Sequence, residues 1–368
     1  MSCNKDDDSS QWKPQVLNTQ ISSVTSEQPN DALFLPSGNI GVIVTRKNIG
    51  INIMELNSIN GNLISSKPII NQPSLFARDL YTEGNSYSIL ADFELASNFR
   101  NIKFLTLNSS MMLESEKIIS SLHHEVGVKM IKANNGNYAL LVNRKRIDSN
   151  TWGFLIYEIN ANGTLNSYDF PHPILQSASD MIRKQDGTGY YVFAHVVEDP
   201  LRSTDYVLYE FDNVFNVVNK RYFGGAEYEE ARQILEDNSG NVYLFGHSAS
   251  NDILHEMYLI KLDSELNMIY DKHYGSEYHD GGQTMCFDGG NRLTLIGRTN
   301  APSNTNEGIY YLKINTEGEV LDKQYLGNEY ANRSNIVLNR NGEDFIIGYT
   351  EIDNNFTKNI DFYKITYP

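Results

Sequence analysis

The stretch from Gly240 to Gly290 reads GNVYLFGHSASNDILHEMYLIKLDSELNMIYDKHYGSEYHDGGQTMCFDGG, and the chain repeats its pattern from Gly290 onward. NVYLFGHS corresponds to NRLTLIGRT, EMYLIKLDSELN to IYYLKINTEGE, and DKHYGSEY to DKQYLGNEY. An internal repeat of about 50 residues is typical of solenoids, propellers and arrays. The repeat therefore decides the fold before any single residue is considered.

A regular series of Asn and Asp residues extends this repeat over the whole chain. Each follows an apolar residue, and the steps between them are 51 or 52 residues: Asn57, Asn108, Asn160, Asp212, Asp263 and Asn315. Asn and Asp side chains can bond the backbone two residues further on and so begin a turn. One more step reaches Thr366, so the series predicts seven units, of which the last is shortened.

Each unit contains four short apolar runs. In the clearest unit they are Gln233–Leu235, Val242–Gly246, Met257–Leu262 and Met268–Tyr274. These runs are rich in β-branched and aromatic residues and are bounded by Gly, Asn, Asp and Ser, which is typical of strands and turns. No segment has a helical stripe of useful length. The sequence therefore predicts an all-β fold, a seven-bladed β-propeller with four antiparallel strands per blade.

The two ends of the chain are expected to complete each other. The seventh unit ends at Phe362–Tyr367 without a fourth strand, and Val16–Ile21 is an apolar-alternating run without partner strands of its own. An N-terminal strand that completes the last blade would close the ring and pair an otherwise open edge. We therefore expect a propeller over residues 14–368 and a flexible tether over residues 1–13.

Composition limits the classes of partner. The formal net charge of −16 argues against nucleic acid, because its binding needs clustered Lys and Arg. No run of eighteen apolar residues is present, so no membrane-spanning helix is expected. Of the two cysteines, Cys286 lies in an apolar run and is expected to be a free, buried core thiol.

Loop lengths distinguish the two faces of the predicted disc. The loop between the second and third strands of a unit is the longest, as in Arg144–Trp152, Val197–Asp205 and Asn300–Glu307. In an up-and-down blade this loop and the blade-to-blade loop share one face, which we call the long-loop face. The short turns share the other, which we call the plain face. Function usually resides on loops, so we expect it on the long-loop face.

Polar residues near the start of each innermost strand should converge on the mouth of the central channel. They are Asp31, Arg78, Asp79, His124, Glu125, Asp180, Glu230, Arg232, Asp280, Gln283, Asn332 and Arg333. Carboxylate pairs among them could perform glycosidic acid–base chemistry. The alternative, which we favour because no motif places an acid, a base or a nucleophile, is hydrated channel lining. The candidate binding face comprises Trp152, Tyr228, Tyr278, Tyr330, Asp180, Glu230, Arg232 and Asp280.

Two further patterns have competing interpretations. Glu-Tyr recurs at 227–228, 277–278 and 329–330, either as a contact rim for sugar or protein or as a loop-packing device, which equal spacing favours. His123 and His124 are neighbours on a strand and point to opposite faces, so they cannot share a metal ion. His247, His255, His273 and His279 are scattered and have no ligand spacing. No metal or other cofactor is expected.

The N-terminus MSCNKDDDSS resembles the start of a mature bacterial lipoprotein. Cys3 followed by Lys5 and Asp6–Asp8 further resembles the export signal of surface-exposed lipoproteins in Bacteroidota. The repeat itself is similar to that of β-propeller lipoproteins. This resemblance implies a signal peptide cleaved before Cys3, fatty-acid chains such as palmitate on Cys3, and an outer-membrane protein that faces the cell exterior. The alternative is a disordered acidic tail with an incidental cysteine.

Two classes of function follow. In the first, the protein is a non-catalytic surface lipoprotein that binds a partner, as an accessory subunit of an outer-membrane uptake or secretion complex. In the second, it is a glycan-degrading or glycan-binding propeller that uses the channel carboxylates. We favour the first, because the repeat specifies architecture and no catalytic motif accompanies it.

Overall fold

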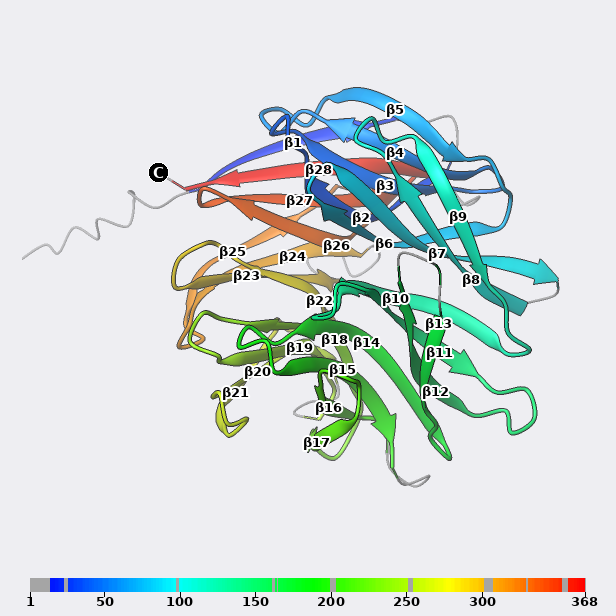
Figure 1. The fold of residues 1–368 in the computed structure, drawn as a ribbon. Coiled ribbons are helices and arrows are strands. Elements are labelled where there is room, and N and C mark those ends of the chain that lie inside the picture. Colours follow the sequence, from blue (N-terminus) through cyan, green and yellow to red (C-terminus); the bar gives the residue numbers. More distant parts are fainter. Residues whose placement is uncertain are drawn as a thin grey trace, which may run out of the picture.

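The computed structural model describes residues 14–22, 26–96, 99–160, 163, 165–198, 203–250, 254–300, 307–328, 330–352 and 357–367. In these residues 28 strands form seven four-stranded antiparallel sheets (Figure 1). The first strands of successive sheets contact one another around a ring that returns from β26 to β2. The described part contains no helix long and apolar enough to cross a membrane. The predicted tether 1–13, with Cys3, lies outside the described residues.

The first three blades follow the chain without interruption, each from its innermost to its outermost strand. Blade 1 contains β2 (Glu27–Phe34), β3 (Ile40–Arg46), β4 (Gly50–Leu56) and β5 (Leu63–Ile70). Blade 2 contains β6 (Leu75–Glu83), β7 (Ser86–Ala96), β8 (Phe99–Leu107) and β9 (Leu113–Ile119). Blade 3 contains β10 (His124–Lys132), β11 (Tyr138–Lys145), β12 (Trp152–Ile159) and β13 (Leu165–Phe170).

Blades 4 to 6 repeat this order. Blade 4 contains β14 (Leu175–Arg183), β15 (Gly189–Val197), β16 (Asp205–Asp212) and β17 (Val217–Phe223). Blade 5 contains β18 (Glu229–Glu236), β19 (Val242–Ser248), β20 (Glu256–Leu262) and β21 (Met268–Tyr274). Blade 6 contains β22 (Asp280–Phe287), β23 (Arg292–Thr299), β24 (Gly308–Asn315) and β25 (Val320–Leu326).

Blade 7 joins the two ends of the chain. It contains β26 (Ala331–Arg340), β27 (Glu343–Glu351), β28 (Lys358–Thr366) and, outermost, β1 (Gln15–Ile21). β1 pairs antiparallel with β28, with Gln15 opposite Thr366 and Ile21 opposite Ile360. In Figure 1, β1 and β28 lie side by side next to the C-terminal end. The predicted seven-bladed propeller, closed by an N-terminal strand, is confirmed.

The turn series found in the sequence has the expected chemistry. Asn57 Oδ1 accepts a hydrogen bond from the Ile59 N–H at 2.8 Å, and Asp263 Oδ1 accepts one from the Glu265 N–H at 2.9 Å. Asn108, Asp212 and Asn315 make the same bond two residues on. Each side chain therefore begins the turn that leads into the outermost strand of its blade.

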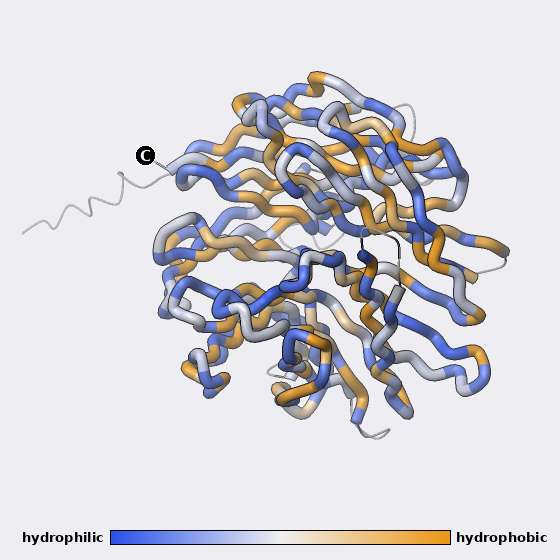
Figure 2. The backbone as a smooth tube through the Cα atoms, in the orientation of Figure 1, coloured by the Kyte–Doolittle hydropathy of each residue, from blue (hydrophilic) through white to orange (hydrophobic). Residues whose placement is uncertain are grey.

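The core consists of apolar layers between neighbouring blades. Figure 2 shows hydrophobic strand interiors alternating with hydrophilic ends and turns. Between blades 3 and 4, for example, Phe154 packs against Phe170 and Tyr209, with ring centroids 5.0 and 5.3 Å apart. Each blade buries one face against each neighbour, which is why the strands read as nearly continuous apolar runs.

Cys286 lies at the junction of blades 6 and 7. It is a free thiol, as predicted, but it is only partly buried, at the edge of the apolar cluster that contains Ile346 and Tyr363. Next to this cluster, the buried Lys313 ammonium donates to Asp344 Oδ2 at 2.9 Å. The junction of blades 6 and 7 thus contains a buried ion pair as well as apolar contacts.

Candidate binding site at the channel mouth

Every innermost strand contains one β-bulge, a local irregularity that sequence spacing did not indicate. The bulged residues, which are skipped in the pairing with the second strand, are Asn30, Arg78, Val128, Ser179, Arg232, Gln283 and Asn335. A bulge redirects a side chain and reverses the two-residue alternation beyond it. The seven bulges therefore decide which side chains face the channel and which face the next blade.

The residue after the bulge fastens its blade to the next one in four cases. Its side-chain oxygen accepts a hydrogen bond from a backbone N–H of the next innermost strand. The pairs are Asp31 with Leu80 at 2.9 Å, Asp79 with Met130 at 2.7 Å, Asp180 with Ile234 at 3.1 Å, and Gln233 with Met285 at 2.6 Å. Asp180, which the sequence placed in the candidate binding face, is thus buried in a contact between blades.

Burial changes the acidity of two of these carboxyl groups. Burial and the neighbouring Asp79 carboxylate raise the pKa of Asp31 to about 8. Burial raises the pKa of Asp180 to about 6, although the Lys129 ammonium opposes the shift. Lys129 Nζ lies 2.8 Å from Asp79 Oδ1. The positive charge of Lys129 also acts on Asp31 and Asp180, so one cation balances part of the negative charge of three carboxyl groups.

Two adjoining pockets open at the channel mouth on the long-loop face, and they share Gln28. The larger has a volume of about 540 Å³ and is lined by Ser26, Gln28, Asn30, Thr45, Arg46, Lys47, Asn48, Ser74, Leu75, Phe76, Arg78, Glu94, Arg100 and Lys358. The smaller, of about 290 Å³, is lined by Gln28, Arg232, Gln283, Arg298, Arg333, Ser334, Asn335 and Tyr349. Five of the seven bulged residues contribute to this lining.

Loop length explains why the larger pocket lies over blades 1 and 2. In blade 1, β3 ends at Arg46 and β4 begins at Gly50, and in blade 2, β7 ends at Ala96 and β8 begins at Phe99. The corresponding connection in blade 6 extends from Thr299 to Gly308. On the long-loop face, only blades 3 to 7 therefore have long connections between their second and third strands. The short connections of blades 1 and 2 leave the channel mouth open above these two blades.

The lining of the two pockets is strongly cationic, although the chain carries a net charge of −16. The cationic lining residues are Arg46, Lys47, Arg78, Arg100, Lys358, Arg232, Arg298 and Arg333. Among the residues that the structure describes, Glu94 is the one carboxylate of the lining. The carboxylates that pair with these cations are the more buried partners. Asp92 is 0% exposed and holds Arg78 and Arg100, which are 28% and 25% exposed. Glu307, at 25%, contacts Arg298 and Arg333, each at 44%.

Arg232 is the member of the predicted binding face that lines a pocket, and Glu230 holds it in place. Glu230 Oε1 lies 2.7 Å from Arg232 Nη2, and its other oxygen lies 3.2 Å from His247 Nε2. Tyr228 donates its hydroxyl hydrogen to the same carboxylate. Burial opposes ionisation of Glu230, but His247, Arg232 and Tyr228 outweigh burial and hold its pKa well below the ordinary value. Glu230 is therefore an ionised support for Arg232.

The structure also gathers histidines that sequence spacing did not connect. The ring centroids of His247 and His255 lie 5.5 Å apart, and those of His255 and His279 lie 5.7 Å apart. Burial lowers the pKa of His247 and of His255, so both are neutral near pH 7. In the described part of the chain, no group of three or more His, Cys, Asp or Glu side chains has the geometry to hold a metal ion.

The remaining predicted residues lie in the blade-to-blade loops or at the start of the innermost strands that follow them. Asp280 is fully buried and accepts a hydrogen bond from the Ser276 hydroxyl at 2.8 Å, which fixes the loop that carries Tyr278. Asn332 donates to Asn328 Oδ1 at 3.1 Å and so fixes the loop of Tyr330, whose side chain is exposed. Glu329 lies outside the described residues. A repeated loop-fixing device accounts for the spacing of these tyrosines.

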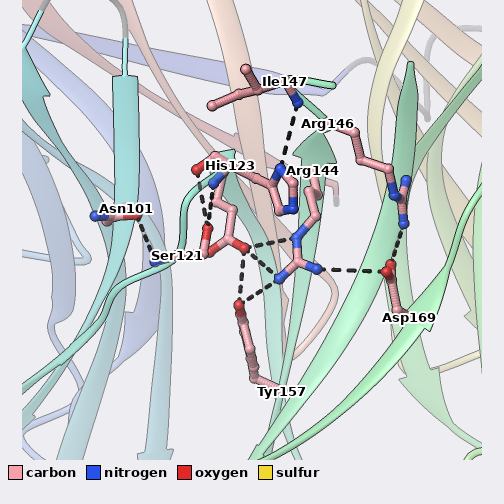
Figure 3. Close-up of polar contacts among 9 residues, drawn as sticks. Asn101, Ser121, His123, Arg144, Arg146, Ile147, Tyr157 and Asp169 are labelled. Carbon is pink, nitrogen blue, oxygen red and sulfur yellow. Dashed lines mark hydrogen bonds and ion pairs between the residues drawn. The ribbon is translucent and has the colours of Figure 1, made fainter. Parts of the chain in front are cut away.

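A separate polar cluster lies in blade 3 (Figure 3), and Trp152 lies beside it. The buried Glu125 carboxylate accepts hydrogen bonds from Arg144 Nη2 at 2.7 Å and from the Tyr157 hydroxyl at 2.9 Å. Figure 3 shows Arg144 and Arg146 both directed at Asp169. Trp152 packs edge-on against His124, with ring centroids 5.7 Å apart. The cluster fixes the long loop of blade 3, and none of its members lines the two pockets.

Comparison with known proteins gives the fold class. No protein-family model matches the chain, and no curated protein sequence matches it. Raptor from Chaetomium thermophilum is similar in structure, with a TM-score of 0.58 and 11% identity, over 97% of this chain and 29% of that one. YCF48 from Cyanidioschyzon merolae has a TM-score of 0.55 and 9% identity, over 94% and 98% of the two chains.

Prolyl oligopeptidase B from Galerina marginata is also similar, with a TM-score of 0.51 and 11% identity, over 92% of this chain and 51% of that one. The chain thus spans less than a third of the Raptor chain and about half of the oligopeptidase. At such identities these likenesses show the fold alone, and propeller folds support many unrelated functions. The chain is a seven-bladed β-propeller.

Proposed function

We propose that the protein is a non-catalytic binding propeller, a cell-surface lipoprotein of the outer membrane that is anchored through an acylated Cys3. Its channel mouth on the long-loop face binds a partner, as an accessory subunit of an outer-membrane uptake or secretion complex. The observation that carries the proposed binding function is the arrangement of the charged side chains at the channel mouth. Carboxylates are turned inward as supports, and cationic side chains are left facing two open pockets.

The same arrangement disfavours the glycan-degrading alternative. Glycoside hydrolysis needs two carboxyl groups that face one substrate bond, one of them protonated. Asp180 is bonded to the Ile234 and Met181 N–H groups, Glu230 to Arg232, His247 and Tyr228, and Asp280 to Ser276. Each has a structural partner, and none lines the pockets.

Purification from native membranes in mild detergent tests the proposal. We expect an outer-membrane protein to co-purify with the wild type, and a fatty-acid analogue to label the wild type but not Cys3→Ala. A chain that purifies alone and cleaves members of a glycan panel would favour the enzymatic alternative. Failure of the wild type to incorporate fatty acid would remove the lipid anchor from the proposal.

A further inference from the structure

We infer that the two pockets at the channel mouth form one site for an acidic peptide segment, whose Asp and Glu side chains the Arg and Lys residues of the lining receive. This inference rests on the proposed binding function and names the chemistry of the partner. It concerns the described residues around Gln28, where the two pockets meet.

The charged groups around the two pockets favour an anionic ligand. Asp92 contacts Arg78 and Arg100, and Glu307 contacts Arg298 and Arg333. Glu27 contacts Arg46, Glu230 contacts Arg232, and Glu351 contacts both Arg333 and Lys358. Arg298 Nη1 lies 3.8 Å from Glu307, at the long end for an ion pair, and its side chain is among the most exposed of the lining. A guanidinium offers a planar fork of donors that matches a carboxylate. Over the two pockets together, eight lining cations of the described residues face six carboxylates, which are Glu27, Asp92, Glu94, Glu230, Glu307 and Glu351, and the net positive charge favours a ligand anion.

Carboxylates hold the guanidinium groups of the lining in position. Because the supporting carboxylates are less exposed than the guanidinium groups that they contact, they hold these groups toward the pockets before any ligand arrives. Arg232 is fixed by Glu230, and Arg333 is fixed by Glu307. Prepositioned side chains lose less conformational freedom on binding, which favours affinity.

The shape of the two pockets favours an extended ligand. Pockets of about 540 and 290 Å³ that adjoin at one residue suit an extended ligand with several anionic groups better than one compact ion. The neutral lining side chains include Gln28, Gln283 and Asn335, whose amides can both donate to and accept from a peptide backbone. A long polyanion is disfavoured, because outside the mouth it would lie along a protein of net charge −16.

The aromatic side chains distinguish a peptide from an acidic glycan. Protein sites for sugars commonly offer a free aromatic face, and here a cation lies over one face of each of the two aromatic rings in the described lining. The Arg100 guanidinium lies 4.3 Å from the centre of the Phe76 ring, and the Lys358 ammonium lies 4.2 Å from the centre of the Tyr349 ring. These cation–π contacts would have to break before a sugar ring could stack. The lining therefore favours carboxylates on a peptide.

Fluorescence anisotropy with a labelled hexaglutamate peptide and the purified wild-type chain tests the inference. We expect saturable binding that weakens as salt is raised from about 50 to about 500 mM. Arg298→Gln/Arg333→Gln should weaken binding by about tenfold or more, because two charge-assisted contacts are lost. The matched control Lys272→Gln/Lys323→Gln removes the same charge from the outer strands β21 and β25 and should change the affinity by less than about twofold.

Several outcomes would overturn the inference. They are no binding of hexaglutamate at low salt, equal weakening by the mouth variant and the control, or tighter binding of oligogalacturonate or single-stranded DNA than of hexaglutamate. Arg298→Gln alone, which disturbs only a long contact, and the charge-conserving Arg298→Lys/Arg333→Lys separate lost recognition from lost folding. Melting temperatures of all variants accompany the titrations.

The two proposals fail in different ways. If a partner co-purifies from membranes and stays bound to Arg298→Gln/Arg333→Gln, the acidic-peptide site is wrong and the binding function stands. If purified protein binds hexaglutamate through the mouth but no partner is found in membranes, the site stands and the accessory-subunit function is wrong.

Discussion

Gln20 Nε2 donates a hydrogen bond to Asp361 Oδ1 at 2.9 Å, and so joins the first strand of the chain to the last. Thr19 also donates its hydroxyl hydrogen to the Asn60 carbonyl at 2.7 Å, which connects β1 to blade 1. The N-terminal strand therefore contacts both sides of the junction at which the ring closes. Its loss should affect the whole propeller, because the apolar faces of blades 7 and 1 rely on this closure.

Ile21→Ala should destabilise the fold by about 2 kcal/mol, because Ile21 is a buried member of the apolar cluster that contains Ile360. Leu17→Ala, on the same strand but exposed, should change stability by less than about 0.5 kcal/mol. Urea denaturation measures both values. Equal effects of the two substitutions would contradict the structural role of β1.

Asp180→Ala should lower the free energy of unfolding by about 1–3 kcal/mol, because it leaves the buried Ile234 N–H without its acceptor. Asp180→Asn retains an acceptor oxygen and should lose less. Urea denaturation measures the stability of both variants, and the result also decides between a structural role and a binding role for Asp180. A stable Asp180→Ala protein with impaired ligand binding would return Asp180 to the binding face.

The stability of the fold should depend on pH through Asp31. Its pKa is raised from the ordinary 3.8 to about 8, so the folded chain retains a proton that the unfolded chain releases. The stabilising contribution is therefore fully present below about pH 4 and is lost as the pH rises toward 8. Asp31→Asn keeps an acceptor for the Leu80 N–H but does not titrate.

Melting temperatures of the wild type and Asp31→Asn should therefore converge near pH 4 and diverge toward pH 9, where the variant is the more stable. The histidines with lowered pKa values contribute a pH dependence of the opposite sign, but they are common to both proteins and cancel in the difference. A constant difference across the range would show that Asp31 is ionised in the folded chain.

Cys286 should react slowly with a thiol reagent until the protein unfolds. Burial raises its pKa above the ordinary value, and the thiolate is the reactive form. Labelling followed by mass spectrometry in native buffer and in urea measures the contrast. Rapid labelling in native buffer would mean that the junction of blades 6 and 7 opens readily.

The architecture was predictable because strand and turn chemistry is local. Asn57 and Asp263 begin their turns through bonds to residues two positions away, and such bonds repeat wherever the spacing repeats. The missing fourth strand of the last unit and the unpaired run near Val16 have only one simple joint solution, which the pairing of β1 with β28 confirms. The sequence also indicated which face would carry the channel-mouth residues.

The binding site was only partly predictable, for two physical reasons. Arg232 and Arg298 lie on neighbouring blades and Arg333 on the next, so they converge through the closed ring and not through any sequence spacing. In addition, a bulge changes the alternation of each innermost strand. It directs Arg78 to the mouth and the adjacent Asp79 to the next blade.

The sequence by itself thus determined the number of blades, their strands and turns, and the closure of the ring, since each depends on contacts between near neighbours or on an unpaired edge. The tertiary structure alone decided which carboxylates support the fold and which cations remain available to a ligand. That division depends on burial and on partners from other blades. It turned Asp180 and Glu230 into structural supports, and it brought Arg298, Arg333 and Lys358 to the mouth.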